Sequence, residues 1–129
     1  HVLGPFRRNH FVYVAESVDG GVVGFASAGP SRSNNLPYKA EVYTIYLQDD
    51  YQGQGIGRQL FACTVARAQE ARGPSVIVWC LSNNPSRFFY ERMGGTLVAR
   101  RPGKVGTANV EEIGYAWDDA SDLAVWGSA

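Results

Sequence analysis

The ten residues from Tyr51 to Leu60 read YQGQGIGRQL, and they join a strand-like run to a helix-like run. Glycine occupies three alternate positions of this stretch, Gly53, Gly55 and Gly57. Glycine permits a tight turn and lets a ligand approach the backbone without meeting a Cβ atom. The first N–H groups of the helix have no partner within it, and the helix dipole adds partial positive charge. The stretch therefore predicts an anion site, most often used for phosphate.

Two common phosphate-binding motifs do not fit these residues. A P-loop requires Gly-Lys followed by Ser or Thr, whereas Gly57 is followed by Arg58 and Gln59. A dinucleotide fingerprint requires G-x-G-x-x-G and an acidic residue at the end of the next strand. Here the spacing is G-x-G-x-G, and residues 81–84 are Leu, Ser, Asn and Asn. A simple strand-to-helix turn needs only one glycine. The three glycines therefore favour a ligand-binding turn, of a kind other than these two motifs.

Length and charge narrow the possible partners. The 129 residues predict a single domain spanning 1–129, and a hydrophobic content of 45% suffices for one core. Twelve basic and twelve acidic residues cancel, so no overall field attracts nucleic acid or a membrane surface. No transmembrane run and no signal peptide are visible. We therefore expect a cytoplasmic protein without nucleic acid or membrane partners.

The two cysteines, Cys63 and Cys80, have no metal-ligand spacing. The first falls in a predicted helix and the second in a predicted strand. We expect buried free thiols rather than a disulfide or a nucleophile, and no metal site.

Turn signals and hydrophobic patterns predict alternating strands and helices. Residues 1–10 show no clear periodicity. The run SVIVWCL is almost continuously apolar, which suits a strand buried on both faces. The last two strands are expected to form a hairpin whose loop contains Pro102 and Gly103. The predicted strands are 11–16, 22–28, 40–47, 75–81, 96–101 and 109–117, and the predicted helices are 56–72 and 85–93.

These elements predict an α/β fold with a mixed sheet. The helix between the third and fourth strands implies that those two strands run parallel. The first three strands are expected to form an antiparallel meander. Alternation along the third strand places Glu41, Tyr43, Ile45 and Leu47 on one face.

Gln52, Gly55 and Gly57 match the pattern Gln/Arg-x-x-Gly-x-Gly/Ala, which resembles the signature of the GNAT superfamily of N-acyltransferases. In that family the turn and the helix N-terminus hold the pyrophosphate of acetyl-coenzyme A. The preceding strand pairs its backbone with the pantetheine amides, as an added strand would. The resemblance therefore implies cofactor contacts from Ile45, Tyr46, Leu47, Gln52, Gly53, Gln54, Gly55, Ile56, Gly57 and Arg58.

A second segment, residues 83–95, reads NNPSRFFYERMGG and resembles the GNAT segment that follows the strand after the glycine helix. In many members the tyrosine at the place of Tyr90 protonates the departing thiolate, a general-acid role. The alternative is that Tyr90 packs the helix onto the sheet. Phe88 and Phe89 already supply such packing, and a buried hydroxyl needs a partner, so we expect Tyr90 to be catalytic.

The family also uses an asparagine near this place to contact the pantetheine arm, and its spacing to the tyrosine varies. Asn83 fits one common spacing and Asn84 the other. Asn84 is favoured by its Asn-Pro-x-Arg context, although asparagine before a proline is equally a helix N-cap signal.

A general base is expected because the attacking amine must lose a proton. Some members carry a glutamate on the strand after the glycine helix, but Trp79 and Cys80 occupy that place here. Many relatives with a similar Glu-x-Tyr-x-x-Tyr run carry a glutamate at the position of Glu41. We expect Glu41 to face the acceptor groove and act as the base, with an edge-exposed or hydrogen-bonded glutamate as the alternative.

The resemblance covers Phe11 to about Trp117 and implies a GNAT-like acyltransferase fold whose N-terminal elements are truncated. It implies acetyl transfer from acetyl-CoA, used as the acyl donor without a metal, to an amine on a small molecule or peptide. A homodimer is possible in such a family. The alternative function is a non-catalytic acyl-CoA-binding or regulatory module of the same fold.

Overall fold

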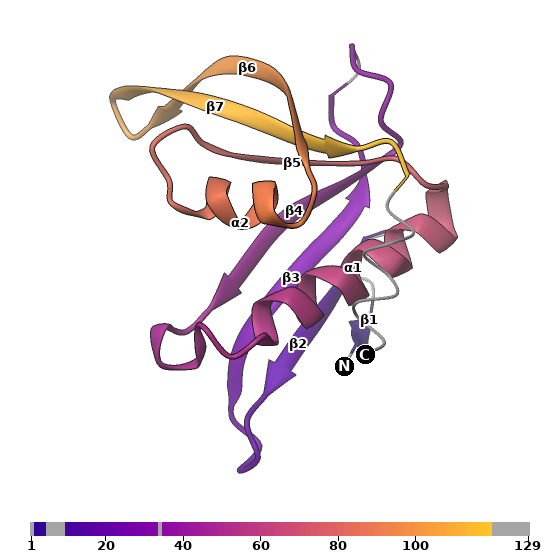
Figure 1. Cartoon of the computed structure of the whole chain (residues 1–129), viewed down its shortest axis with the longest axis vertical. Coiled ribbons are helices and arrows are strands. Elements are labelled where there is room, and N and C mark those ends of the chain that lie inside the picture. The colour runs from indigo at the N-terminus through magenta and orange to yellow at the C-terminus, as the bar shows by residue number, and fades with distance from the viewer. Residues whose placement is uncertain (1, 5–9, 34, 120–129) are drawn as a thin grey trace.

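The computed structural model describes residues 2–4, 10–33 and 35–119. One mixed sheet of seven strands runs through them in the order β1-β2-β3-β4-β5-β7-β6 (Figure 1). The strands are β1 (Val2–Gly4), β2 (Phe11–Glu16), β3 (Val22–Pro30), β4 (Ala40–Leu47), β5 (Val76–Leu81), β6 (Thr96–Val105) and β7 (Ala108–Trp117). The helices are the short 3-10 helix η1 (Asp49–Tyr51), α1 (Ile56–Arg72) and α2 (Ser86–Arg92).

The predicted order of elements and the mixed sheet are confirmed. β2, β3 and β4 form the antiparallel meander, and α1 connects β4 to β5, which pair in parallel. α1 spans the predicted residues and ends before Gly73, whose φ is 93°. β3 continues past Ala28 to Pro30, and the unexpected β1 pairs with β2.

The loop expected around Pro102 and Gly103 is instead part of a strand. β6 runs through both residues, and Pro102 pairs with Glu111 of β7. β6 is the last strand of the sheet, and an edge strand tolerates proline because the missing N–H can fall on the unpaired side. The chain reverses at Gly106, whose φ of 60° suits a tight hairpin turn.

Both helices pack on one face of the sheet (Figure 1). The fully buried ring of Phe61 lies at the centre of their contact. The centre of that ring lies 5.6 Å from Phe89, 5.7 Å from Tyr90 and 5.3 Å from Trp117. Burial of such a side chain stabilises a fold by roughly 1.5–3 kcal/mol. These contacts hold α2 against α1 and so fix the position of Tyr90. Among the described helices, none is long and apolar enough to cross a membrane.

A β-bulge interrupts β4 at Tyr43. Ser27 and Ala28 are neighbours on β3, yet they pair with Thr44 and Val42. Tyr43 is therefore an extra residue in its strand. A bulge bends and twists the strand that contains it, and it shifts the alternation of every later residue by one.

The predicted sharing of one face by four residues of β4 is wrong because of this bulge. Glu41 and Tyr43 lie on the face away from the helices, where both contact the side chain of Arg32. Ile45 packs against the core that the helices cover, and Leu47 lies next to Gly57 of α1. The bulge thus places Glu41 and Tyr43 on one face of the sheet, and Ile45 and Leu47 on the other.

Candidate functional site

β4 and β5 pair over only three positions and then diverge (Figure 1). The pairs are Ala40 with Val76, Glu41 with Ile77 and Val42 with Val78. From residue 44 onward β4 still pairs with β3, but the structure describes no pair with β5. The divergence begins at the bulge, as expected from the bend that a bulge produces. The sheet therefore has an opening, and the free backbone edge of residues 44–47 forms one of its sides.

The glycine turn leads from the end of β4 into α1. Gly53 and Gly55 have φ values of 79° and 82°, a conformation that glycine adopts readily. Gly55 is the N-cap residue, and neither a side-chain cap nor an acidic residue covers the first turn. The N–H of Gln59 bonds to the carbonyl of Gly55 at 3.1 Å, so the N–H groups of Ile56 and Gly57 precede the first intrahelical bond.

The space above the turn is open to a ligand. A Cβ atom built on Gly53 or Gly55 would meet no atom within 4 Å. Uncapped N–H groups at a helix N-terminus, with room in front of them, suit a phosphate group. The first turn of α1 therefore has the donors and the space that the sequence predicted for an anion.

The two glutamines of the turn bind the turn itself. The side-chain nitrogen of Gln52 donates to the carbonyl oxygen of Leu47 at 3.0 Å and to Asp49 at 3.2 Å. The side-chain nitrogen of Gln54 donates to the carbonyl oxygen of Asp50 at 3.3 Å. These bonds brace the loop in its shape, so what Gln52 and Gln54 can offer a ligand is their backbone.

Tyr90 lies in α2 on the helix-covered face and is buried. Its ring packs between Phe61 and Tyr115, at 5.7 Å and 6.1 Å between ring centres. The hydroxyl forms no hydrogen bond to any described residue, unlike that of Tyr115, which donates to Glu91. Burial raises the pKa of the Tyr90 phenol, with a smaller contribution from Cys80. The side chain is therefore a protonated phenol without a described hydrogen-bond partner.

The two asparagines before α2 differ in their environment. The side-chain oxygen of Asn84 accepts a hydrogen bond from the backbone N–H of Ser86 at 2.9 Å. This bond braces the entry to α2, but Pro85 and not Asn84 occupies the N-cap position, because α2 begins at Ser86. The side-chain nitrogen of Asn84 has no partner among the described residues. Asn83 is exposed. The choice between them as a ligand contact stays a prediction.

Glu41 is held by Arg32. The carboxylate accepts a bond from the backbone N–H of Arg32 at 2.9 Å and two from its guanidinium, at 3.2 Å and 2.6 Å. The side chain of Glu41 is 1% exposed and that of Arg32 is 63% exposed. This pairing matches the hydrogen-bonded alternative for Glu41, and Arg32 is a residue that the sequence analysis did not assign.

Three more residues near the opening were not assigned from the sequence. Val76 and Val78 of β5 point into the helix-covered core. Side chains alternate along a strand, so Trp79 points to the opposite face, on which Glu41 also lies. The guanidinium of Arg101 lies 3.7 Å from the centre of the Trp79 ring and donates to Glu112 at 3.0 Å. The cross-strand pairing of β6 with β7 would have placed Arg101 opposite Glu112. The loop predicted around Pro102 excluded that pairing.

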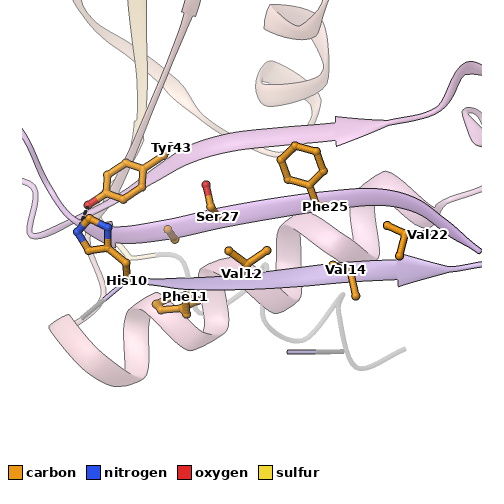
Figure 2. A pocket seen from close by; sticks show the side chains of 9 residues that line it. His10, Phe11, Val12, Val14, Val22, Phe25, Ser27 and Tyr43 are labelled. Carbon is orange, nitrogen blue, oxygen red and sulfur yellow. Dashed lines mark hydrogen bonds between the residues drawn. The ribbon is translucent and has the colours of Figure 1, made fainter. Parts of the chain in front are cut away.

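A groove of about 400 Å³ lies on the same face and ends at Tyr43 (Figure 2). Val12, Val14 and Phe25 line it, and His10 lies at its Tyr43 end. The ring centre of His10 is 5.1 Å from that of Tyr43. The groove thus runs along β2 and β3 to the residue where the sheet opens.

Residues 8–94 match the sequence profile described as an acetyltransferase (GNAT) domain. The chain belongs to the GNAT family. It is 38% identical over 112 residues to the uncharacterized N-acetyltransferase YuaI of Bacillus subtilis. The matched residues cover 87% of this chain and 65% of that protein. It is 30% identical over 98 residues to the L-methionine sulfoximine/L-methionine sulfone acetyltransferase of Pseudomonas aeruginosa, covering 74% of this chain and 56% of that one.

A solved structure has the same fold. A Bacillus anthracis protein in complex with acetyl coenzyme A superposes with a TM-score of 0.72 at 22% identity, over 87% of this chain and 64% of that chain. At this identity the likeness concerns the fold. The present GNAT chain spans 65% and 56% of the lengths of the two curated relatives.

The glycine turn, α1 and α2 all fall within the GNAT match at residues 8–94. The glycine segment and all of residues 83–95 except Gly95 are therefore inside the matched region, and the predicted family is confirmed. β6 and β7, which carry Arg101 and Glu112, lie beyond it.

Proposed function

We propose that this chain is an N-acetyltransferase that moves the acetyl group of acetyl-CoA to an amine by direct attack. The observation that carries the proposal is the opening between β4 and β5 next to an uncapped helix N-terminus. The relatives named as acetyltransferases and the solved complex with acetyl coenzyme A support the same donor. The acceptor is an amine on a small molecule or a peptide.

In this proposal the acyl donor binds from the helix-covered side. The backbone from Gly53 to Arg58 receives the pyrophosphate, since the first N–H groups of α1 point there. The free edge of β4 at Ile45, Tyr46 and Leu47 receives the pantetheine amides in the manner of an added strand. Asn83 or Asn84, at the other side of the opening, contacts the same arm.

The chemistry joins the amine nitrogen to the carbonyl carbon of the thioester and breaks the bond from that carbon to sulfur. Tyr90 donates its phenol proton to the departing thiolate. The raised pKa of the buried phenol keeps this proton in place at neutral pH. The proton that the amine loses goes to solvent, and solvent later restores the phenol.

Glu41 has a positioning role in this proposal, which differs from the base expected from the sequence. A general base must reach the proton that it removes, directly or through one water. The oxygens of Glu41 are instead engaged by Arg32, and the side chain is almost completely enclosed. Glu41 therefore orients Arg32 on the face away from the helices.

Acetyl transfer tests the proposal against a non-catalytic acyl-CoA-binding module. The chain is incubated with acetyl-CoA and a panel of amines, and free thiol is measured together with the mass gain of one acetyl group on the amine. Thiol release that depends on both the protein and the amine supports the proposal. Acetyl-CoA binding in calorimetry, with no thiol release above the protein-free rate for any amine, would favour the binding module.

A further inference from the structure

Cys80 is the first residue past the last β4–β5 pair whose side chain points from β5 to the helix-covered face. Val78 forms that pair with Val42, and both Val76 and Val78 point into the helix-covered core. Side chains alternate along a strand, so Cys80 continues this row while Trp79 points to the opposite face. Cys80 packs against the core accordingly, yet it remains partly exposed. The thiol therefore lies at the edge of the opening, on the side from which the acyl donor is proposed to enter.

Ile45 occupies the corresponding place on β4. It also packs against the helix-covered core and is partly buried, and it follows the bulge after which β4 no longer pairs with β5. In the proposed function the pantetheine arm runs along the free edge of β4 from Leu47, next to the pyrophosphate, to Ile45. The sulfur of the donor then comes at the Ile45 end of the arm, across the opening from Cys80.

The hydroxyl of Tyr90 is an unpartnered donor near the same thiol. Tyr90 belongs to the buried cluster against which Cys80 packs, and it is 4% exposed. Its hydroxyl forms no hydrogen bond to any described residue. Unlike the indole N–H of Trp79, it is not among the fully enclosed unpaired atoms of the described residues, so a ligand can reach it. A buried phenol whose donor is free and reachable indicates that a ligand atom binds beside the thiol.

Both cysteines are free, as the sequence predicted, but they are only partly buried. Burial raises the pKa of the Cys80 thiol, Arg87 opposes the rise, and Glu91 adds to it. At neutral pH the thiol is therefore mostly protonated, and it reacts slowly with a disulfide that only collides with it. The thiolate that does form is a strong nucleophile because its pKa is high. A bound disulfide held next to Cys80 would react faster, because binding supplies proximity and orientation.

We propose that Cys80 is a thiolation site, modified by disulfides of CoA that bind in the donor site. The inference rests on the proposed function and adds a redox control to it. The thiolate of Cys80 attacks the nearer sulfur of CoA disulfide, which forms a bond from Cys80 to that sulfur and breaks the bond between the CoA sulfurs. The second CoA leaves as a thiolate and takes up the proton that Cys80 lost, so the cysteine is oxidised and the departing CoA is reduced. The tethered CoA occupies the donor site and excludes acetyl-CoA until a thiol reductant reverses the exchange.

Mass spectrometry of the full chain tests the site without any acceptor. We would incubate the protein with CoA disulfide and, separately, with hydroxyethyl disulfide at the same concentration, whose leaving group is also an ordinary aliphatic thiol. The proposal predicts one CoA added per chain, mapped to Cys80 in the digested protein, at a rate at least tenfold above that of the small disulfide. Saturating acetyl-CoA is expected to slow the addition at least tenfold, and dithiothreitol is expected to remove the CoA.

Cys63→Ser is the matched control for Cys80→Ser. Cys63 is also free and partly buried, but it lies in α1 near Tyr13 of β2, whose pKa it helps to raise. In the sheet, β3 and β4 separate β2 from β5. Cys80→Ser and Cys80→Ala are expected to take up no CoA, whereas Cys63→Ser should react at the wild-type rate. Treated wild type and treated Cys63→Ser should lose acetyl-CoA binding in calorimetry and regain it with dithiothreitol, while the affinity of Cys80→Ser should be the same before and after treatment.

The outcomes separate the thiolation site from the proposed function. CoA found on Cys63, equal rates with the two disulfides, or no protection by acetyl-CoA would overturn the thiolation site, while acetyl-CoA binding and acetyl transfer would stand. Undiminished addition of CoA to Cys80→Ser would do the same. If acetyl-CoA itself fails to bind in calorimetry, the proposed function is overturned and the thiolation site falls with it.

Discussion

Val42 of β4 and Val78 of β5 form the last described pair between these two strands. The next residue of β4 is the bulged Tyr43, so the opening begins at a defined position in the sheet. α1 and α2 cover one face of the opening, and Arg32, Arg101 and the groove lie on the other. In our account the donor and the acceptor meet through the sheet at this position.

Tyr90→Phe is expected to lower kcat about a hundredfold or more, because it removes a positioned acid. Its fold and its affinity for acetyl-CoA should be retained, since the hydroxyl bonds to no described residue. Tyr115→Phe is the control: it loses the bond to Glu91 and should lose stability but little activity. Wild-type kcat in Tyr90→Phe would make Tyr90 a packing residue.

The buried Tyr90 also predicts a loss of stability at high pH. Its pKa is raised by burial above the ordinary tyrosine value of about 10. Below that pH both the folded and the unfolded chain keep the proton, whereas above it the unfolded chain releases the proton first. The free energy of unfolding should then fall by about 1.4 kcal/mol per pH unit for each such group. Urea unfolding between about pH 9 and 11 should show a shallower decline for Tyr90→Phe than for the wild type, and identical slopes would contradict this.

Loss of Arg32 and loss of Glu41 should lower the free energy of unfolding by different amounts. Arg32→Gln leaves a carboxylate that is 1% exposed without its cation, which costs about 3–5 kcal/mol for a buried pair. Glu41→Gln leaves an arginine that solvent already reaches and should cost only about 1 kcal/mol. Chemical denaturation of both variants measures the difference, and equal losses would show that the carboxylate is not as enclosed as the structure indicates.

Kinetics of Glu41→Gln separate positioning from proton removal. If Glu41 orients Arg32, KM for the acceptor should rise severalfold while the shape of the pH profile of kcat/KM stays the same. If the acidic limb of that profile disappears in the variant, Glu41 is the general base that the sequence suggested.

The elements that the sequence predicted well are those with local signals. Three glycines and a long apolar stripe located the turn and α1 to the residue, and Gly73 marked its end. Asn84 before proline indicated the start of α2 to within one residue. Such features depend on backbone conformation and on helix periodicity, which a single sequence contains.

The features that the sequence did not predict depend on pairing between strands. Simple alternation placed Glu41 with Ile45, and only the register with β3 reveals the bulge at Tyr43. Pro102 was expected in a loop because its tolerance depends on β6 being the edge strand. The resulting error hid the Arg101 and Glu112 pair, whose contact with Trp79 requires the full order of the sheet.

The central claim is that acetyl-CoA binds with its pyrophosphate at the first turn of α1, and Gly57→Glu tests it. Gly57 is helical, and a Cβ there would approach only the Cδ2 atom of Leu47, at 3.9 Å. Glutamate is favoured over glycine within a helix, and a carboxylate in the first turn stabilises the helix, so the variant should be at least as stable as the wild type. Gly55→Val is a less specific test, because the φ of 82° at Gly55 strains any other residue.

The deciding measurement is calorimetric titration of acetyl-CoA into the wild type, Gly57→Glu and the control Gly57→Ala, which keeps the Gly/Ala pattern of the motif. We predict at least a tenfold loss of affinity for Gly57→Glu, because its carboxylate repels the phosphate and competes for the N–H groups of the first turn, and wild-type affinity for Gly57→Ala. Wild-type affinity in a folded Gly57→Glu would contradict the account and place the acyl donor elsewhere.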